Sequence, residues 1–172
     1  MKVGSNQGFT LVELVIVIAV LGLIAAYAVP YYSNLTRNAR LTVLDGIAAS
    51  MRSAADMTKM KARASGLRPA SSNPAGSGGN QYGYVVQFPF GSAEVDWRNL
   101  CPESKAELGN RLTMIDFLDF YDADLQTRID NRYTLIGYQL PASGVPTNQG
   151  CYVIYDSFGD PNCTVTVVDV DC

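Results

Sequence analysis

Glu13 is the only charged residue between Phe9 and Val29, in a stretch of 21 residues that is mostly apolar. At a rise of about 1.5 Å per residue, a helix of that length spans the hydrocarbon core of a bilayer, which is about 30 Å thick. A carboxylate in hydrocarbon costs on the order of several kcal/mol unless it is paired. The pattern therefore indicates a membrane-spanning helix in which Glu13 has a specific partner. A Glu13 that is protonated, or that snorkels to the membrane interface, is the alternative.

The eight residues before this stretch, MKVGSNQG, form a short polar leader. A cut between Gly8 and Phe9 would keep the apolar run as the mature N-terminus and create an α-amine four residues before Glu13. That amine can pair with Glu13 in the same chain or in a neighbouring copy, where the pair would set the axial register between subunits. A secretory signal cut near AAYAVP is the competing interpretation. Glu13 is unusual in a signal core, however, and the helical pattern continues past Pro30.

The chain contains no histidine, which excludes Ser-His-Asp and Cys-His catalysis within this chain. Its glycine-rich stretch at 76–80 lacks the lysine and the strand–helix context of a phosphate-binding loop. We therefore expect neither an enzyme nor a bound cofactor.

Four aspartates lie close together in the sequence: Asp119, Asp122, Asp124 and Asp130. Calcium takes oxygen ligands of this kind, but the spacing and the glycine of an EF-hand are missing. A solvated acidic face is the favoured interpretation, so no metal is predicted, and a calcium site at these aspartates is the alternative.

All four cysteines lie in the second half of the chain, and none forms a C-x-x-C pair. A Cys₄ zinc site would have very irregular spacing, so two disulfides in an oxidising compartment are the better interpretation. Four cysteines allow three pairings. If CYVIYD and CTVTVVDVDC form a hairpin, Cys151 lies opposite the chain end, which favours Cys151–Cys172 and leaves Cys101–Cys163.

The charges are unevenly distributed, although the net charge is only −3. Residues 1–80 hold eight Lys/Arg and three Asp/Glu, whereas residues 81–172 hold five and thirteen. An acidic solvated surface on the C-terminal part accounts for this pattern, and a head-to-tail contact between copies, positive stem against negative head, is the alternative. No basic cluster with interleaved aromatics is present, so direct contact with nucleic acid is not expected.

One long helix is predicted from Phe9 to about Ala64. Apolar residues recur at three- and four-residue steps between Leu41 and Ala55, so residues 31–64 form the amphipathic half and residues 9–30 the apolar half. The apolar half is expected to project from the domain.

Two residues weaken the apolar half of this helix. Gly22 costs about 1 kcal/mol relative to alanine, and Pro30 removes a hydrogen bond at a cost of about 3 kcal/mol. We expect the helix to stretch or bend between Gly22 and Pro30 when copies of the chain assemble, and a mere kink is the alternative. After Ala64, residues 65–81 are rich in Ser, Gly and Pro and predict an exposed loop.

The remainder, residues 82–172, reads as an antiparallel sheet of about four strands laid across the C-terminal half of the helix. The strand-like segments are 82–88, 132–140, 151–156 and 164–171. Residues 114–129 are ambiguous, with a short helix as one interpretation, and part of CPESKAEL also reads as helical. The fold class is therefore α+β, a long N-terminal helix packed on an antiparallel sheet.

Residues 8–30, GFTLVELVIVIAVLGLIAAYAVP, closely resemble the prepilin signal of the type IV pilins. Gly8 stands before the family's cleavage point, Phe9 matches its first mature residue, Glu13 the fifth and Pro30 the twenty-second. Residues 30–54 also resemble, more loosely, the mannose-sensitive haemagglutinin branch of the pilins.

The resemblance implies that a prepilin peptidase removes the leader 1–8 and methylates the amine of Phe9. It implies that Glu13 attracts the N-terminal amine of the adjacent subunit, that residues 65–81 are the αβ-loop, and that the last two cysteines enclose the D-region. The expected product is a homopolymeric pilus, assembled from the inner membrane by a platform protein and an ATPase, with its heads first periplasmic and then extracellular.

The expected outputs are adhesion to a surface receptor or substratum, or motility. Two alternatives share the same N-terminus: a pseudopilin of a type II secretion system and a minor pilin for DNA uptake.

Overall fold

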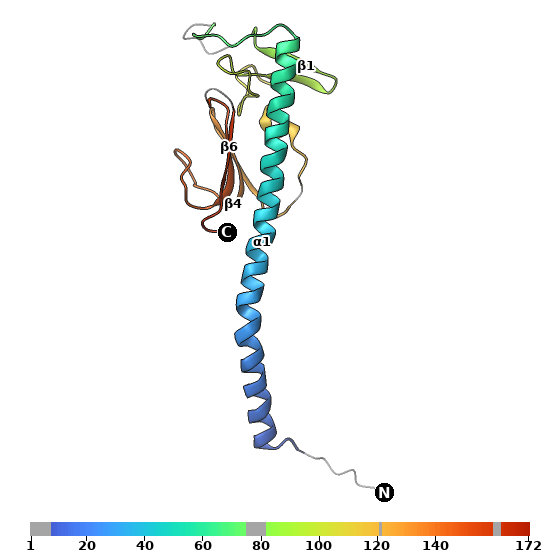
Figure 1. Ribbon diagram of the computed structural model, residues 1–172, viewed down its shortest axis with the longest axis vertical. Helices are drawn as coiled ribbons and strands as arrows, with labels where there is room; N and C mark the ends of the chain where they lie inside the picture. Colours follow the sequence, from blue (N-terminus) through green and yellow to red (C-terminus); the bar gives the residue numbers. More distant parts are fainter. Residues whose placement is uncertain (1–7, 75–81, 121, 160–162) are drawn as a thin grey trace. The chain divides into compact units, whose positions relative to one another are not determined.

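The computed structural model describes residues 8–74, 82–120, 122–159 and 163–172 (Figure 1). The predicted leader, apart from Gly8, and the part of the predicted loop at 75–81 lie outside the described residues. The helix α1 runs from Leu11 to Ala64. The chain divides into two compact units, Met1–Ala39 and Arg40–Cys172.

The described part of the first unit is helix from Leu11 onward. Its side chains are exposed from Gly8 to Leu35 without a break. This stretch is hydrophobic on every side rather than along one stripe, and none of its sides is buried within the first unit.

In the second unit, the helix residues from Arg40 to Ala64 bury one stripe. The stripe follows three- and four-residue steps and consists of Leu44, Ile47, Ala48, Met51, Ala54, Ala55, Thr58 and Ala62. Many of these side chains are small, so the helix can approach the sheet closely. The guanidinium of Arg40 lies 5.0 Å from the ring centroid of Tyr138, which begins the contact between helix and sheet.

A four-stranded antiparallel sheet packs on this stripe. Its strands, in spatial order, are β3 (Gln126–Ile129), β4 (Tyr133–Gln139), β5 (Cys151–Asp156) and β6 (Thr164–Val168).

Side chains of β5 alternate between the two faces of this sheet, as the pleat requires. Val153 and Tyr155 join the core against α1, whereas Tyr152 packs with Leu135 in a separate cluster. Gly137 in β4 is required by close approach, because a Cβ there would lie 2.3 Å from the carbonyl oxygen of Cys151.

A separate two-stranded hairpin follows the helix, formed by β1 (Val85–Phe88) and β2 (Gly91–Glu94). It has its own small core, in which Val86 packs with Ala62 of α1 and with Val95 and Leu100. The short 3₁₀ helix η2 (Met114–Phe117) then places Met114 in the main core.

The predicted fold class is confirmed, but two assignments within it were wrong. Residues 82–88 were expected in the main sheet; instead β1 pairs with β2, a strand that sequence reasoning missed. The edge of the main sheet is taken by β3, from the segment that was ambiguous. The CPESKAEL segment is not helical, because the Glu94 carboxylate accepts the amides of Glu107 and Leu108 in a non-helical loop.

Candidate functional site

Glu13 forms three hydrogen bonds with Thr10 at the start of α1. Its Oε2 accepts from the amide of Thr10 at 2.9 Å and from the hydroxyl at 2.8 Å. The amide of Glu13 in turn donates to Thr10 Oγ1 at 3.2 Å. This is a capping box, in which the N-cap residue and the third helical residue satisfy one another's backbone donors. The Thr-x-x-Glu spacing is the signal that would have revealed it.

The predicted cleavage point lies before the helix. Gly8 and Phe9 are both exposed and non-helical, and the helix begins only at Leu11. A side chain added at Gly8 would have no neighbouring atom within 4 Å. A protease can therefore approach this peptide bond without unwinding α1.

The apolar half of α1 carries a dense set of exposed large side chains. They include Leu11, Ile16, Leu21, Ile24 and Tyr31, each more than half exposed. By length and composition the helix is able to cross a membrane, and none of its apolar window is buried. Such a surface is stable only in lipid or against other apolar surface.

Gly22 and Pro30 both lie within continuous helix in this structure. Pro30 has no amide to donate, and a side chain added at Gly22 would meet no neighbouring atom within 4 Å. In the single chain these two residues do not interrupt α1. The stretching expected between them concerns the assembled state.

Two disulfides, Cys101–Cys163 and Cys151–Cys172, cross-link residues 82–172, which we call the head. They are the two bonds that the hairpin argument favoured. The hairpin itself is formed by β5 and β6, with Tyr152 opposite Val168. The second bond ties the first residue of β5 to the last residue of the chain.

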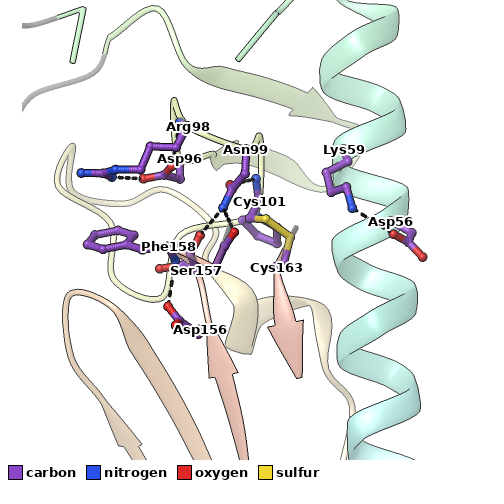
Figure 2. The surroundings of a disulfide bond; sticks show 12 residues. Asp56, Lys59, Asp96, Arg98, Asn99, Cys101, Asp156, Ser157, Phe158 and Cys163 are labelled. Carbon is purple, nitrogen blue, oxygen red and sulfur yellow. Dashed lines mark hydrogen bonds and ion pairs between the residues drawn. A yellow bond between two sulfur atoms is a disulfide. The ribbon is translucent and has the colours of Figure 1, made fainter. Parts of the chain in front are cut away.

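Asn99 organises the surroundings of the first disulfide (Figure 2). Its Nδ2 donates to the carbonyl oxygens of Ser157 and Gly159, both at 2.8 Å, and its Oδ1 accepts the amide of Cys101 at 2.8 Å. Nη1 of Arg98 lies 2.6 Å from Oδ2 of Asp96. Figure 2 shows these two side chains next to one another. The bonds from Asn99 to Ser157 and Gly159 join residues about 60 positions apart, so the sequence carried no signal for them.

Three acidic side chains are buried in this loop region: Glu94, Asp96 and Glu103. Burial, with the negative charges of Asp96 and Glu94 nearby, raises the pKa of Glu103 to about 9. Burial also raises the pKa of Asp96, although Arg98 acts against this shift. Glu103 is therefore a neutral acid at pH 7, which its sequence context did not indicate.

The aspartates between 119 and 130 do not converge on one point. Asp122 accepts the hydroxyl of Tyr138 at 2.9 Å, and Asp130 pairs with Arg128 at 3.4 Å. Asp130 also accepts the amides of Arg132 and Tyr133. Within the described parts of the chain, no group of three His, Cys, Asp or Glu side chains is placed to hold a metal.

Comparison with known proteins gives a family model at the N-terminus. The prokaryotic N-terminal methylation motif matches residues 4–29, which include Gly8, Phe9 and Glu13. No solved structure shows a significant match to the chain.

Curated relatives extend the likeness. The chain is 42% identical over 57 residues to the type IV narrow pilus major component PilA5 of Thermus thermophilus, covering 33% of this chain and 49% of that protein. It is 35% identical over 68 residues to the type IV major alpha-pilin of Moraxella bovis, covering 40% and 43%. The type II secretion system core protein G of Pseudomonas aeruginosa is 29% identical over 110 residues, covering 59% and 78%.

An exposed apolar helix that overlaps a methylation motif, in a chain with an α+β fold, is the combination that a type IV pilin-like protein has. In its motif and in its curated relatives, this chain is similar to the type IV pilins. The chain spans about half, or less, of the length of the pilins it matches. The mannose-sensitive haemagglutinin branch stays a prediction.

Proposed function

We propose that this chain is a structural subunit of a type IV pilus, which polymerises through residues 9–30 after the leader 1–8 is removed. One observation carries the proposal: the part of α1 that lies within the methylation motif exposes an uninterrupted apolar surface with a single carboxylate, Glu13. Identical helices leaving lipid together can cover that surface against one another.

Processing at Gly8 and Phe9 would prepare the chain for assembly. A prepilin peptidase would cut between them and methylate the amine of Phe9, and the exposed, non-helical backbone there supports access. Glu13 would then attract the amine of an adjacent subunit. A carboxylate has about four acceptor positions, so its two bonds from Thr10 leave room for this partner.

The head would first lie in the periplasm and then on the outside of an extracellular fibre. Two disulfides support an oxidising compartment for residues 82–172. A platform protein and an ATPase would extract the subunit from the inner membrane. Adhesion to a receptor or substratum, or motility, would be the output of the fibre.

In the filament, the helix would stretch or bend between Gly22 and Pro30. The missing amide of Pro30 and the low helix propensity of Gly22 support this change. A filament map with continuous helical density through these residues would contradict it.

A pseudopilin is the second candidate. The match to core protein G of the type II secretion system spans 78% of that relative, a larger share than the pilin matches cover. A minor pilin for DNA uptake is a third, against which the acidic composition of residues 81–172 argues. A major pilin dominates sheared surface fibres, whereas a pseudopilin or minor pilin does not, so abundance separates them.

The intact mass of the subunit in sheared fibres tests the proposal. We expect a chain that begins at methylated Phe9 and retains the apolar helix. A mature protein that begins after Val29 would overturn the proposal, because it would lack the polymerising segment.

A further inference from the structure

Each disulfide of the head joins one buried cysteine to one that reaches the surface. Cys101 and Cys151 are fully buried, whereas Cys163 and Cys172 are partly exposed. A thiolate opens a disulfide by attacking one of its two sulfurs, so the attacked sulfur must be accessible from outside. An external thiol therefore approaches these two bonds at Cys163 and at Cys172.

Cys163 lines an open depression beside α1, with a volume of about 360 Å³. The other residues that line this depression all belong to α1 and are Arg52, Ala55, Asp56 and Lys59. Pockets for drug-sized ligands begin at about 300 Å³, so a small organic thiol can enter. Figure 2 shows the disulfide together with the side chains of Asp56 and Lys59 on α1. The depression thus gives access to Cys163 from the side of the helix.

The charges in this depression favour an anionic reagent. Two cations, Arg52 and Lys59, face one carboxylate, that of Asp56, among its described lining residues. The guanidinium of Arg52 is held near Cys163, because its Nη2 donates to the carbonyl oxygen of Val165 at 3.3 Å. The ammonium of Lys59 lies 3.3 Å from Oδ1 of Asp56. An excess of positive charge in a depression raises the local concentration of anions, including negatively charged thiols.

The cations near Cys163 come from α1 and not from the neighbouring sequence. Residues 133–172, which hold both accessible cysteines, contain four aspartates and no Lys or Arg. Asp169 and Asp171 lie within three residues of Cys172. Oδ2 of Asp171 accepts the amide of Gly150 at 2.7 Å, next to the Cys151–Cys172 bond. We therefore expect an anionic thiol to be attracted less to Cys172 than to Cys163.

We propose that Cys163 is a site of reversible thiol–disulfide exchange that prefers anionic thiols. The incoming thiolate attacks Sγ of Cys163 and forms a mixed disulfide there. The bond to Cys101 breaks, its electron pair leaves on Sγ of Cys101, and that thiolate takes a proton from water. The number of disulfide bonds is conserved, so no further oxidant or reductant takes part.

Hydrogen bonds keep the opened bond ready to close again. Nδ2 of Asn99 donates to the carbonyl oxygens of Ser157 and Gly159, and its Oδ1 accepts the amide of Cys101 (Figure 2). None of these contacts involves a sulfur atom, so Cys101 stays tied to the segment that precedes Cys163 after the bond opens. Its thiolate can then attack Cys163 and release the added thiol.

Three small thiols of different charge test the preference on the full-length chain in a neutral detergent. Thioglycolate is negative, 2-mercaptoethanol is neutral and cysteamine is positive. After a brief exposure, acid quenching, alkylation and peptide mass spectrometry measure how much of each disulfide has opened. The opening of Cys101–Cys163 divided by that of Cys151–Cys172, which we call the opening ratio, cancels the intrinsic reactivity of each thiol.

We expect the opening ratio to be highest for thioglycolate and lowest for cysteamine, with a difference of about threefold or more. Salt at about 1 M should reduce this difference, because it screens charges beyond about 3 Å. An equal opening ratio for the three thiols, or the reverse order, would overturn the proposal.

Two substitutions on α1 should shift the opening ratio for thioglycolate in opposite directions. Arg52→Gln removes a cation and should lower the ratio by about twofold, whereas Asp56→Asn removes the carboxylate and should raise it by a similar factor. Both residues are exposed, and thermal unfolding verifies that the variants are folded. An unchanged ratio in both folded variants would show that the depression does not select the thiol.

The position of the adduct identifies the sulfur that is attacked. We expect thioglycolate on Cys163 and an alkylated thiol at Cys101, and removal of free thiol should release the adduct as the disulfide closes. An adduct chiefly on Cys101, or one that persists after the free thiol is removed, would overturn the proposed site. These readouts need no fibre, so their failure would leave the proposed function untouched.

Discussion

Glu13 lies three residues after Thr10 and holds both the amide and the hydroxyl of that residue through a single oxygen, Oε2. The carboxylate therefore has two separable roles. Its hydrogen bonds complete the helix start within one chain, and its charge is available to a neighbouring subunit. Substitutions that keep one role and remove the other distinguish them.

Glu13→Gln should assemble poorly, although glutamine can still complete a capping box. Glu13→Ala should do the same and also lose the cap, at about 1 kcal/mol of helix stability. Both variants should remain in the membrane fraction, since the apolar stretch is unchanged. Sheared-fibre yield against membrane content measures the effect, and normal yield from Glu13→Gln would show that the charge does not set the register.

Substitutions at Gly8 should impair leader removal in order of size. The structure leaves open space around this residue, so the expected defect arises in the peptidase rather than in the folding of the substrate. Gly8→Ala should be processed poorly and bulkier residues worse. Intact-mass measurement of membrane-bound protein would show the leader retained, and full processing of a bulky variant would contradict the predicted cut.

The head should lose stability as pH rises from about 4.5 to about 9. Burial raises the pKa of Glu103 to about 9, so the folded state keeps a proton that the unfolded chain releases near its ordinary value of 4.5. The raised pKa of Asp96 acts in the same direction. Denaturant midpoints at about pH 5, 7 and 9 measure the slope. Glu103→Gln should flatten it, and an unchanged slope in that variant would exclude Glu103 as the cause.

Removal of the Cys101–Cys163 bond should cost more stability than removal of Cys151–Cys172. The first closes 62 residues and the second 21, and the chain-entropy relation converts that ratio to about 1 kcal/mol. Paired Cys→Ala variants, compared by denaturant midpoints, test the order. Equal midpoints, or the reverse order, would mean that contacts such as those of Asn99 outweigh loop entropy.

Gly137→Ala should destabilise the head by about 1–3 kcal/mol or more, because the added methyl meets backbone that cannot move aside. The nearest atoms, the carbonyl oxygen of Cys151 and the Cα of Tyr152, lie at 2.3 and 2.4 Å. Gly83→Ala is the matched control, since its position is open. Similar thermal midpoints for the two variants would show that β4 and β5 can separate without loss.

Local patterns predicted a large part of this architecture. The helix was predicted to end near Ala64, and it does. The prediction was possible because a three- and four-residue apolar repeat can be read from the sequence without knowing what the helix packs against. The segment 151–156 coincides with β5, since its alternation places Val153 and Tyr155 on one face.

Patterns of this kind could not assign strand partners. The segment at 82–88 was placed in the wrong sheet, and β2 was missed, because GSAE carries no apolar alternation. Pairing depends on which backbone edges meet after folding, and a strand pattern looks the same in either sheet.

By itself, the sequence determined the apolar helix and the acid at position 13, whereas the leader boundary that it suggests stays a prediction. These features depend on neighbours within a few residues, and helix geometry converts them directly into structure. The tertiary structure alone decided that Glu103 is buried beside other acids, that Asn99 holds the loop around a disulfide, and that Phe117 walls a groove on α1. The contacts of Asn99 and Phe117 bring together segments distant in the chain, and the burial of Glu103 is a property of the folded chain rather than of its local sequence.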